Sequence, residues 1–235
     1  MGGALTTIGF DADDTLWHNE RYFALSHDRF AALLAEHSER DHLMARLLEA
    51  ERRNLPHYGY GIKGFTLSMI ETAIEVTEGK VPAEVIGDLL AAGREMLDHP
   101  IELLPHVEDV LETLRGDYRL IVVTKGDLLD QERKLAQSGL RERFDAVEIV
   151  SRKTEAAYRH IFKQHGQGAA RGLMVGNSLA SDVRPMIEAG GWGVYVPHDL
   201  TWAMEHAEPP TNSPRFVEIK DLSGLPETVK KIVSG

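Results

Sequence analysis

The stretch that decides the fold is LTTIGFDADDTL, residues 5–16. Its first half, Leu5–Phe10, is apolar and rich in β-branched residues, which predicts a buried strand. Three acids follow within four positions: Asp11, Asp13 and Asp14. Carboxylates this close raise one another's pKa, and a bound divalent cation would remove that cost. Capping of a helix would explain one or two acids, but not why they begin directly after a buried strand.

The rest of the chain places this strand in a larger fold. From residue 17 to about 98, apolar residues recur at helical spacing in four groups, broken by a Gly- and aromatic-rich segment at 56–65. After Pro105, predicted helices (107–114, 128–137, 155–165, 182–189, 226–233) alternate with predicted strands (119–123, 146–150, 172–175, 193–196, 216–219). This alternation is typical of an α/β fold whose parallel sheet is covered on both faces.

We therefore expect a doubly wound, Rossmann-like parallel sheet with a helical cap domain inserted after the first strand. Residues 1–16 and 105–235 would form the α/β core, which is the catalytic domain. Residues 17–104 would form the α-helical cap. Inserted modules of this kind commonly lie over the carboxyl ends of the strands, where open α/β sheets bind ligands.

Composition excludes several classes of function. The formal net charge is −11 and no Lys/Arg run occurs, which argues against nucleic acid or anionic membrane as a partner. The absence of cysteine excludes disulfides, thiolate metal sites and cysteine catalysis. No apolar run reaches the length of a membrane span, and the N-terminus lacks the charged and apolar regions of a signal peptide. We expect a cytoplasmic protein.

Three later segments bring complementary groups to the predicted strand ends. The second core strand ends in Thr124-Lys125-Gly126, where a hydroxyl and a turn glycine could offer donors to an anion. Ser151–Thr154 follows the third strand and contains Lys153, which taken alone would be a solvated surface lysine. The fourth strand runs into Gly176–Asp182, where Ser181 or Asp182 taken alone would be a helix cap. Together they place carboxylates, a hydroxyl and a lysine at one edge of the sheet.

In this order the four segments resemble the motifs of the haloacid dehalogenase (HAD)-like hydrolase superfamily. The first motif is Asp11-x-Asp13-x-Thr15, the second Thr124, the third Lys153, and the fourth Asn177 to Asp182. The predicted helical insertion between the first two motifs resembles the α-helical type 1 cap of the phosphatase branch.

The resemblance implies a role for each matching residue. Asp11 would attack phosphorus and Asp13 would act as general acid and then general base. The transferring phosphoryl group would be held by Thr124, Lys125, Gly126 and Lys153. Mg²⁺ would be bound by Asp11, the Asp13 main-chain carbonyl and Asp182, with water completing the octahedron. Many members carry an acid where this chain has Asn177, so its part in the metal site is left open.

The expected activity is Mg²⁺-dependent hydrolysis of a small phosphorylated metabolite, a phosphate monoester, through an aspartyl-phosphate on Asp11.

Several other functions are compatible with part of this pattern. A phosphomutase shares every core motif. A 2-haloacid dehalogenase would not need Asp13, because dehalogenation has no leaving oxygen to protonate. A receiver-type signalling domain is disfavoured by the position of Asp11 on the first strand and by the inserted helices. A non-catalytic phospho-ligand-binding protein would require that Asn177 disables the metal site. The oligomeric state is not determined by the sequence.

Substrate choice is expected to lie in the cap. His57, Tyr58, Tyr60 and Lys63 gather in a chain otherwise short of aromatic residues. They would contact the leaving group of the substrate, or would pack a helix–helix connection, and the sequence leaves both interpretations open. Residues 196–202 leave the fifth core strand and could flank the same cleft, although Trp202 is better explained as a hydrophobic anchor.

Overall fold

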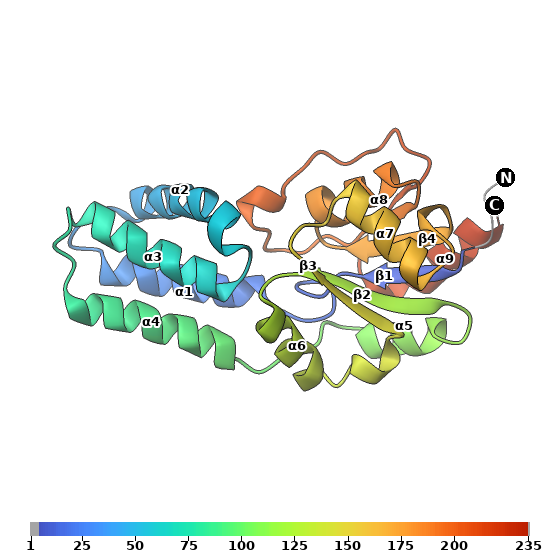
Figure 1. The fold of residues 1–235 in the computed structure, drawn as a ribbon, viewed down its shortest axis with the longest axis horizontal. Helices are drawn as coiled ribbons and strands as arrows, with labels where there is room; N and C mark the ends of the chain where they lie inside the picture. Colours follow the sequence, from blue (N-terminus) through green and yellow to red (C-terminus); the bar gives the residue numbers. More distant parts are fainter. Residues whose placement is uncertain (1–4, 235) are drawn as a thin grey trace. The chain divides into compact units, whose positions relative to one another are not determined.

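The computed structural model describes residues 5–234, so residues 1–4 and 235 of the expected core lie outside it. One part of it contains a six-stranded, fully parallel sheet with the strand order β3-β2-β1-β4-β5-β6; Figure 1 labels its strands β1 to β4. The strands are β1 (Thr7–Phe10), β2 (Arg119–Lys125), β3 (Ala146–Val150), β4 (Gly172–Gly176), β5 (Trp192–Tyr195) and β6 (Phe216–Glu218). This order confirms the doubly wound, Rossmann-like α/β fold.

Strand β1 lies in the middle of the sheet, and all four of its residues are buried. It pairs with β2 on one side and β4 on the other, with Phe10 opposite both Val122 and Val175. The strand order reverses at this point, and in open α/β sheets ligands bind at the carboxyl ends of the strands beside such a reversal. Asp11 is the first residue beyond β1, so the register places it there.

Helices cover both faces of the sheet. They are α5 (Val107–Leu114), α6 (Leu128–Gln137), α7 (Glu155–His165), α8 (Arg184–Glu188) and α9 (Leu225–Ser234). Val122 belongs to the apolar cluster that contains α5 and α9 residues, whereas its neighbour Ile121 belongs to the cluster that contains α7 and α8 residues. Successive side chains of a strand point to opposite faces, so the two clusters are the two sides of the core.

The helix expected at 182–189 is shorter than its sequence pattern indicates. The chain first makes a π-helical turn, Leu179–Val183, and α8 begins only at Arg184. Pro185 suits the first turn of α8, because the amide hydrogen that proline lacks would have no partner within the helix there. The preceding turn leaves Asp182 outside a regular α-helix.

The inserted segment forms four helices: α1 (Glu20–Leu33), α2 (Arg40–Tyr58), α3 (Ile62–Val76) and α4 (Ala83–Asp98) (Figure 1). Their apolar faces meet in a core of their own that includes Phe30, Leu47, Met69 and Leu89. We expected four helices here, and the number agrees.

The break between α2 and α3 is shorter than the expected 56–65. Helix α2 continues through Pro56 to Tyr58, and only residues 59–61 separate it from α3. Pro56 lies in the last turn of α2, where the missing amide hydrogen costs a single helical hydrogen bond. The Gly59 amide then donates to the Leu55 carbonyl at 3.0 Å and closes the helix.

The chain divides into two compact units. One comprises the chain up to Glu20, Ile101–Lys125 and the chain from Gln131 onward, and it contains the sheet. The other comprises Arg21–Pro100 together with Gly126–Asp130. In residues 5–234, no helix is long and apolar enough to cross a membrane. The cytoplasmic location stays a prediction.

Candidate active site

The site is organised around the buried amine of Lys153. Its Nζ donates to Oδ1 of Asp11 and, at 2.6 Å, to Oδ1 of Asp182. The three residues come from the ends of β1, β3 and β4, and all three are buried. Thr154, the next residue, caps helix α7 by accepting from the Ala157 amide at 3.2 Å, so the segment that carries Lys153 is held where it leaves β3.

Asp182 approaches the sheet so closely that only glycine fits beneath it. A Cβ atom on Gly176 would lie 2.2 Å from Asp182 Oδ2. The same oxygen accepts the Ser178 amide at 3.0 Å. The glycine at the end of β4 is therefore what allows the Asp182 carboxylate to reach Lys153.

The surroundings raise the pKa values of both Asp11 and Lys153, but for different reasons. Burial and the Asp182 carboxylate raise the pKa of Asp11 to about 7, although Lys153 acts in the opposite direction. Burial alone would lower the pKa of Lys153, but the two carboxylates raise it overall. The amine stays charged, whereas Asp11 is an acid that an additional nearby cation would strengthen.

Asp13 faces a separate set of donors. Trp17 Nε1 and Lys134 Nζ donate to its Oδ1 at 2.8 and 3.0 Å, and Gln131 Nε2 donates to its Oδ2 at 2.8 Å. Lys134 and Gln131 lie on α6 and are buried. Burial alone would raise the pKa of Asp13, but Lys134 and the hydrogen bonds from Gln131, Lys134 and Trp17 lower it overall.

Asp14 has a structural role at the start of α1. Its carboxylate accepts the amides of Asn19 at 2.8 Å and Glu20 at 3.0 Å, and His198 Nε2 lies 3.6 Å away. Burial raises the pKa of Asp14 to about 6. The three acids after β1 are thus separated: one meets Lys153, one meets Lys134, and one caps a helix. The helix-capping explanation holds for Asp14.

Asn177 lies where oxygen atoms of the first motif converge. When its amide is turned so that the nitrogen faces them, it donates to the Asp13 main-chain oxygen at 3.2 Å and to Asp11 Oδ2 at 3.0 Å. Its main-chain amide donates to the Thr15 hydroxyl at 3.1 Å. In residues 5–234, no three His, Cys, Asp or Glu side chains form a metal-binding group, so any cation here would rely on main-chain oxygen and water as well.

The three residues expected at the second motif lie in different surroundings. Thr124 is buried at the end of β2. The Lys125 amine instead forms an ion pair with Glu205 and donates to the Ser181 hydroxyl at 2.7 Å. Gly126 has a φ of 145°, which favours glycine, and belongs to the helical unit.

A model of the haloacid dehalogenase-like hydrolase family matches residues 5–190. The chain belongs to this family. The family model spans all four motifs around Lys153, as the resemblance indicated.

Individual proteins resemble this chain in sequence or in fold. A crystal structure of a haloacid dehalogenase-like hydrolase from Xanthomonas campestris is 40% identical, with a TM-score of 0.88, and the match covers 99% of this chain and 94% of the other. The pyrimidine 5'-nucleotidase YjjG of Escherichia coli is 30% identical over 93 residues, which are 37% of this chain and only 41% of that protein. The HAD-hydrolase YfnB of Bacillus subtilis, in a structure bound to magnesium, is 18% identical, with a TM-score of 0.67 and a match over 97% and 99% of the two chains. Solved 2-haloacid dehalogenases share the fold as well, at 17–18% identity.

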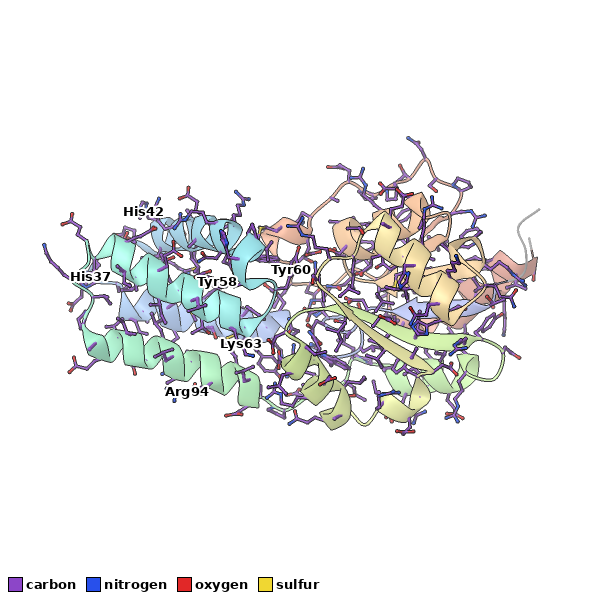
Figure 2. The ribbon with its side chains drawn as sticks, viewed as in Figure 1. His37, His42, Tyr58, Tyr60, Lys63 and Arg94 are labelled. Atoms are coloured by element: carbon purple, nitrogen blue, oxygen red, sulfur yellow. The ribbon has the colours of Figure 1, made fainter. Side chains whose placement is uncertain are left out.

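In this HAD-like hydrolase, the expected cap residues lie around the α2–α3 connection. Figure 2 shows Tyr58, Tyr60 and Lys63 there, at the end of the helical unit opposite His37 and His42. Tyr58 is exposed, and its ring lies 6.4 Å from that of His57. Lys63 Nζ lies 3.0 Å from both carboxylate oxygens of Asp127, so its charge has a partner within the protein. Whether these residues contact a substrate stays a prediction.

Sequence reasoning did not find four side chains that touch the motifs. They are Gln131 and Lys134 beside Asp13, Tyr158, whose hydroxyl donates to the Ser181 carbonyl at 3.0 Å, and Glu205 beside Lys125. Tyr158 on α7 and Gln131 and Lys134 on α6 are buried, but the spacing of apolar residues in the sequence does not mark polar side chains as buried. Glu205 lies in a loop with no regular pattern, and no signal in the sequence singles it out.

Proposed function

We propose that this protein is a Mg²⁺-dependent phosphatase that hydrolyses a small phosphate monoester through an aspartyl-phosphate on Asp11. The observation that carries the proposal is the pair of acids two residues apart, held by different partners. Asp11 meets the Lys153 amine, whereas Asp13 meets Lys134, Gln131 and Trp17. Because the two carboxylates contact separate groups, they can take separate nucleophilic and acid–base roles.

In the first half-reaction, an Asp11 carboxylate oxygen attacks phosphorus and forms the acyl-phosphate bond. The bond from phosphorus to the leaving oxygen breaks, and Asp13, once protonated, gives its proton to that oxygen. Lys153 and Thr124 hold the non-bridging phosphoryl oxygens. Lys153 also offsets the repulsion between the incoming phosphate and the Asp11 carboxylate, and positioning of this kind supplies most of the catalysis in phosphoryl transfer.

In the second half-reaction, water attacks the phosphorus of the aspartyl-phosphate. Asp13 is now a carboxylate and takes a proton from that water. Inorganic phosphate leaves, and Asp11 returns as a carboxylate with Asp13 protonated for the next turnover. A general acid–base group of this kind contributes about 10²–10⁴-fold to the rate.

The residues present fit Mg²⁺. The Asp11 and Asp182 carboxylates and the Asp13 main-chain carbonyl are the hard oxygen donors that Mg²⁺ prefers, with water completing the shell. Asn177 lies within 3.2 Å of the Asp13 oxygen and 3.0 Å of Asp11 Oδ2, so these two donors converge. Two buried carboxylates and a single lysine leave negative charge for a cation to compensate. When bound, Mg²⁺ would neutralise charge on the phosphoryl oxygens and strengthen the acidity of Asp11.

The presence of a carboxylate at position 13 favours phosphate esters over organohalides as the substrate class. A carbon–halogen bond releases a halide that needs no proton, so a dehalogenase has no use for a carboxylate at this position. A phosphomutase shares the same groups, and only product analysis separates it from a hydrolase. The family assignment is consistent with a phosphatase and with a dehalogenase.

The deciding experiment measures phosphate release from p-nitrophenyl phosphate with Mg²⁺ and with excess EDTA, and halide release from 2-chloropropionate in parallel. We expect Mg²⁺-dependent phosphate release, no halide release, and no turnover by Asp11→Asn, because an amide cannot attack phosphorus. Activity that survives chelation would contradict the metal assignment, and halide release would favour the dehalogenase. A panel of phosphate esters that includes pyrimidine 5'-nucleotides, the substrates named for the E. coli relative, then addresses specificity.

A further inference from the structure

Glu205 gathers three groups of the sheet unit around one partly buried carboxylate. Its Oε1 forms an ion pair with Lys125, and its Oε2 accepts from the Ser178 hydroxyl and, at 2.6 Å, from the Ser181 hydroxyl. Lys125 also donates to Ser181 at 2.7 Å. Glu205 belongs to a short 3₁₀ turn, Ala203–Glu205, in the loop after β5. Every donor of the group thus converges on a single side chain.

The burial of this group makes its contacts energetically important. The side chains of Glu205 and Lys125 are only 13% and 15% exposed. Burial alone would raise the pKa of Glu205, but Lys125 and the two serine hydroxyls lower it overall. Removing one partner of such a pair leaves a buried charge without compensation, which costs far more than losing an exposed ion pair. The arrangement is therefore held tightly.

Both serines belong to the turn that carries Asp182. The Ser178 hydroxyl, which donates to Glu205, accepts the Ser181 amide at 3.0 Å and so caps the turn. The Ser178 amide donates to Asp182 Oδ2 at 3.0 Å, and the Asp182 amide donates to the Ser178 carbonyl at 2.9 Å. A displacement of Ser178 is thus transmitted directly to the Asp182 carboxylate.

We propose that Glu205 is a positioning residue for the metal site, acting through Ser178 and Ser181 on Asp182, with Lys125 as its charge partner. This inference rests on the proposed function, because it assigns Glu205 to the Mg²⁺ affinity of that same site. It also gives Lys125 a different role from the phosphate contact expected from the sequence: its amine is directed to Glu205 and Ser181.

The test compares Mg²⁺ affinity in the wild type, Glu205→Ala, Glu205→Gln and the control Glu208→Gln, which alters an exposed acid of the same loop. Affinity is read in two ways: from the rise in melting temperature during a Mg²⁺ titration, and from the Mg²⁺ concentration that gives half-maximal turnover. Partners that orient metal ligands typically affect metal affinity by about 10–100-fold. We expect a loss in this range for Glu205→Ala and a smaller one for Glu205→Gln, which keeps one acceptor oxygen for the serines. Glu208→Gln should match the wild type.

Lys125→Met separates the two roles of the lysine. We expect it to weaken Mg²⁺ binding as the Glu205 variants do, while the KM for substrate at saturating Mg²⁺ stays within about twofold of wild type, a change of roughly 0.4 kcal/mol. A raised KM with unchanged Mg²⁺ affinity would overturn the inference in favour of a phosphate contact.

The outcomes are distinguishable. A merely structural role for Glu205 would lower the melting temperature equally with and without Mg²⁺ and leave the affinity unchanged, and this would overturn the inference alone. If Glu205→Ala does not fold, the Glu205→Gln titration decides. A wild type without Mg²⁺-dependent phosphatase activity would overturn the proposed function, and this inference with it.

Discussion

The Lys134 amine lies 3.0 Å from Asp13 Oδ1, and the Lys134 side chain is only 7% exposed. A buried ammonium group therefore contacts the proposed general acid and base. Lys134 also donates to the Asn19 side chain at 2.8 Å, so it is held from two directions.

Lys134→Met should lower the free energy of unfolding by about 1.5–3 kcal/mol, the usual contribution of a hydrogen bond to a charged group, and should change the pH dependence of turnover. Loss of the positive charge raises the pKa of Asp13, so the limb of the pH–rate profile governed by Asp13 should move to higher pH. Lys134→Arg, which keeps the charge, should keep that limb close to its wild-type position. An unchanged profile in Lys134→Met would show that the lysine only packs α6.

Asn177→Asp should widen the difference in melting temperature between Mg²⁺-bound and Mg²⁺-free protein. The new carboxylate would lie beside Asp11 Oδ2, where it repels Asp11 without a cation and attracts Mg²⁺ when the ion is present. Asp182→Ala should instead raise the Mg²⁺ requirement sharply. Thermal melts across a Mg²⁺ titration measure both effects. If Asp182→Ala left the Mg²⁺ requirement unchanged and Asn177→Ala raised it strongly, Asn177 rather than Asp182 would be the principal metal ligand.

Gly176→Ala should abolish Mg²⁺-dependent turnover, because the added methyl group would lie 2.2 Å from Asp182 Oδ2 and force that carboxylate to move. Gly87→Ala is the matched control: nothing lies within 4 Å of its added methyl group, and it sits inside helix α4. The control should keep full activity and gain up to about 1 kcal/mol in stability. Circular dichroism together with turnover measures both variants, and an active Gly176→Ala would contradict the packing argument.

Asp127→Ala should raise kcat/KM selectively for substrates that carry a second anionic group. It removes the ion-pair partner of Lys63, a residue that we predict to contact the substrate, and so leaves that amine available for a second anionic group. Lys63→Ala should lower kcat/KM for the same substrates. Both side chains are partly exposed, so stability should change by less than about 1 kcal/mol. Parallel changes for every ester in a panel, or a large fall in melting temperature, would indicate that the pair only stabilises the α2–α3 connection.

Acidification should destabilise the protein partly through Glu205. Its pKa in the folded state lies below the ordinary value of 4.5, because the effect of Lys125 and the serines exceeds that of burial. The ionised side chain therefore stabilises the fold above about pH 4.5, and this contribution is lost as the pH falls through the folded-state pKa. Urea unfolding of wild type and Glu205→Gln from pH 7 to pH 3 should show their difference in stability shrinking toward low pH. A difference that stays constant would mean that ionisation of Glu205 does not contribute.

The sequence by itself determined the order of elements and the residues at the ends of the strands. Apolar, β-branched runs and helical patterns follow from which side chains must be buried, so β1, the four inserted helices and the alternation after Pro105 could be read directly. Parallel strands put their carboxyl ends at one edge, so the sequence also placed Asp11, Lys153 and Asp182 together.

Only the tertiary structure decided how each charge is compensated. The sequence shows three acids after β1 but not that Asp13 meets Lys134 from α6, a helix more than 100 positions away. Nor does it show that Lys125 is held by Glu205 from the loop after β5. Periodicity reports the burial of a side chain within its own element. Ion pairs between distant elements depend on where the whole fold brings side chains together, and no local pattern encodes that.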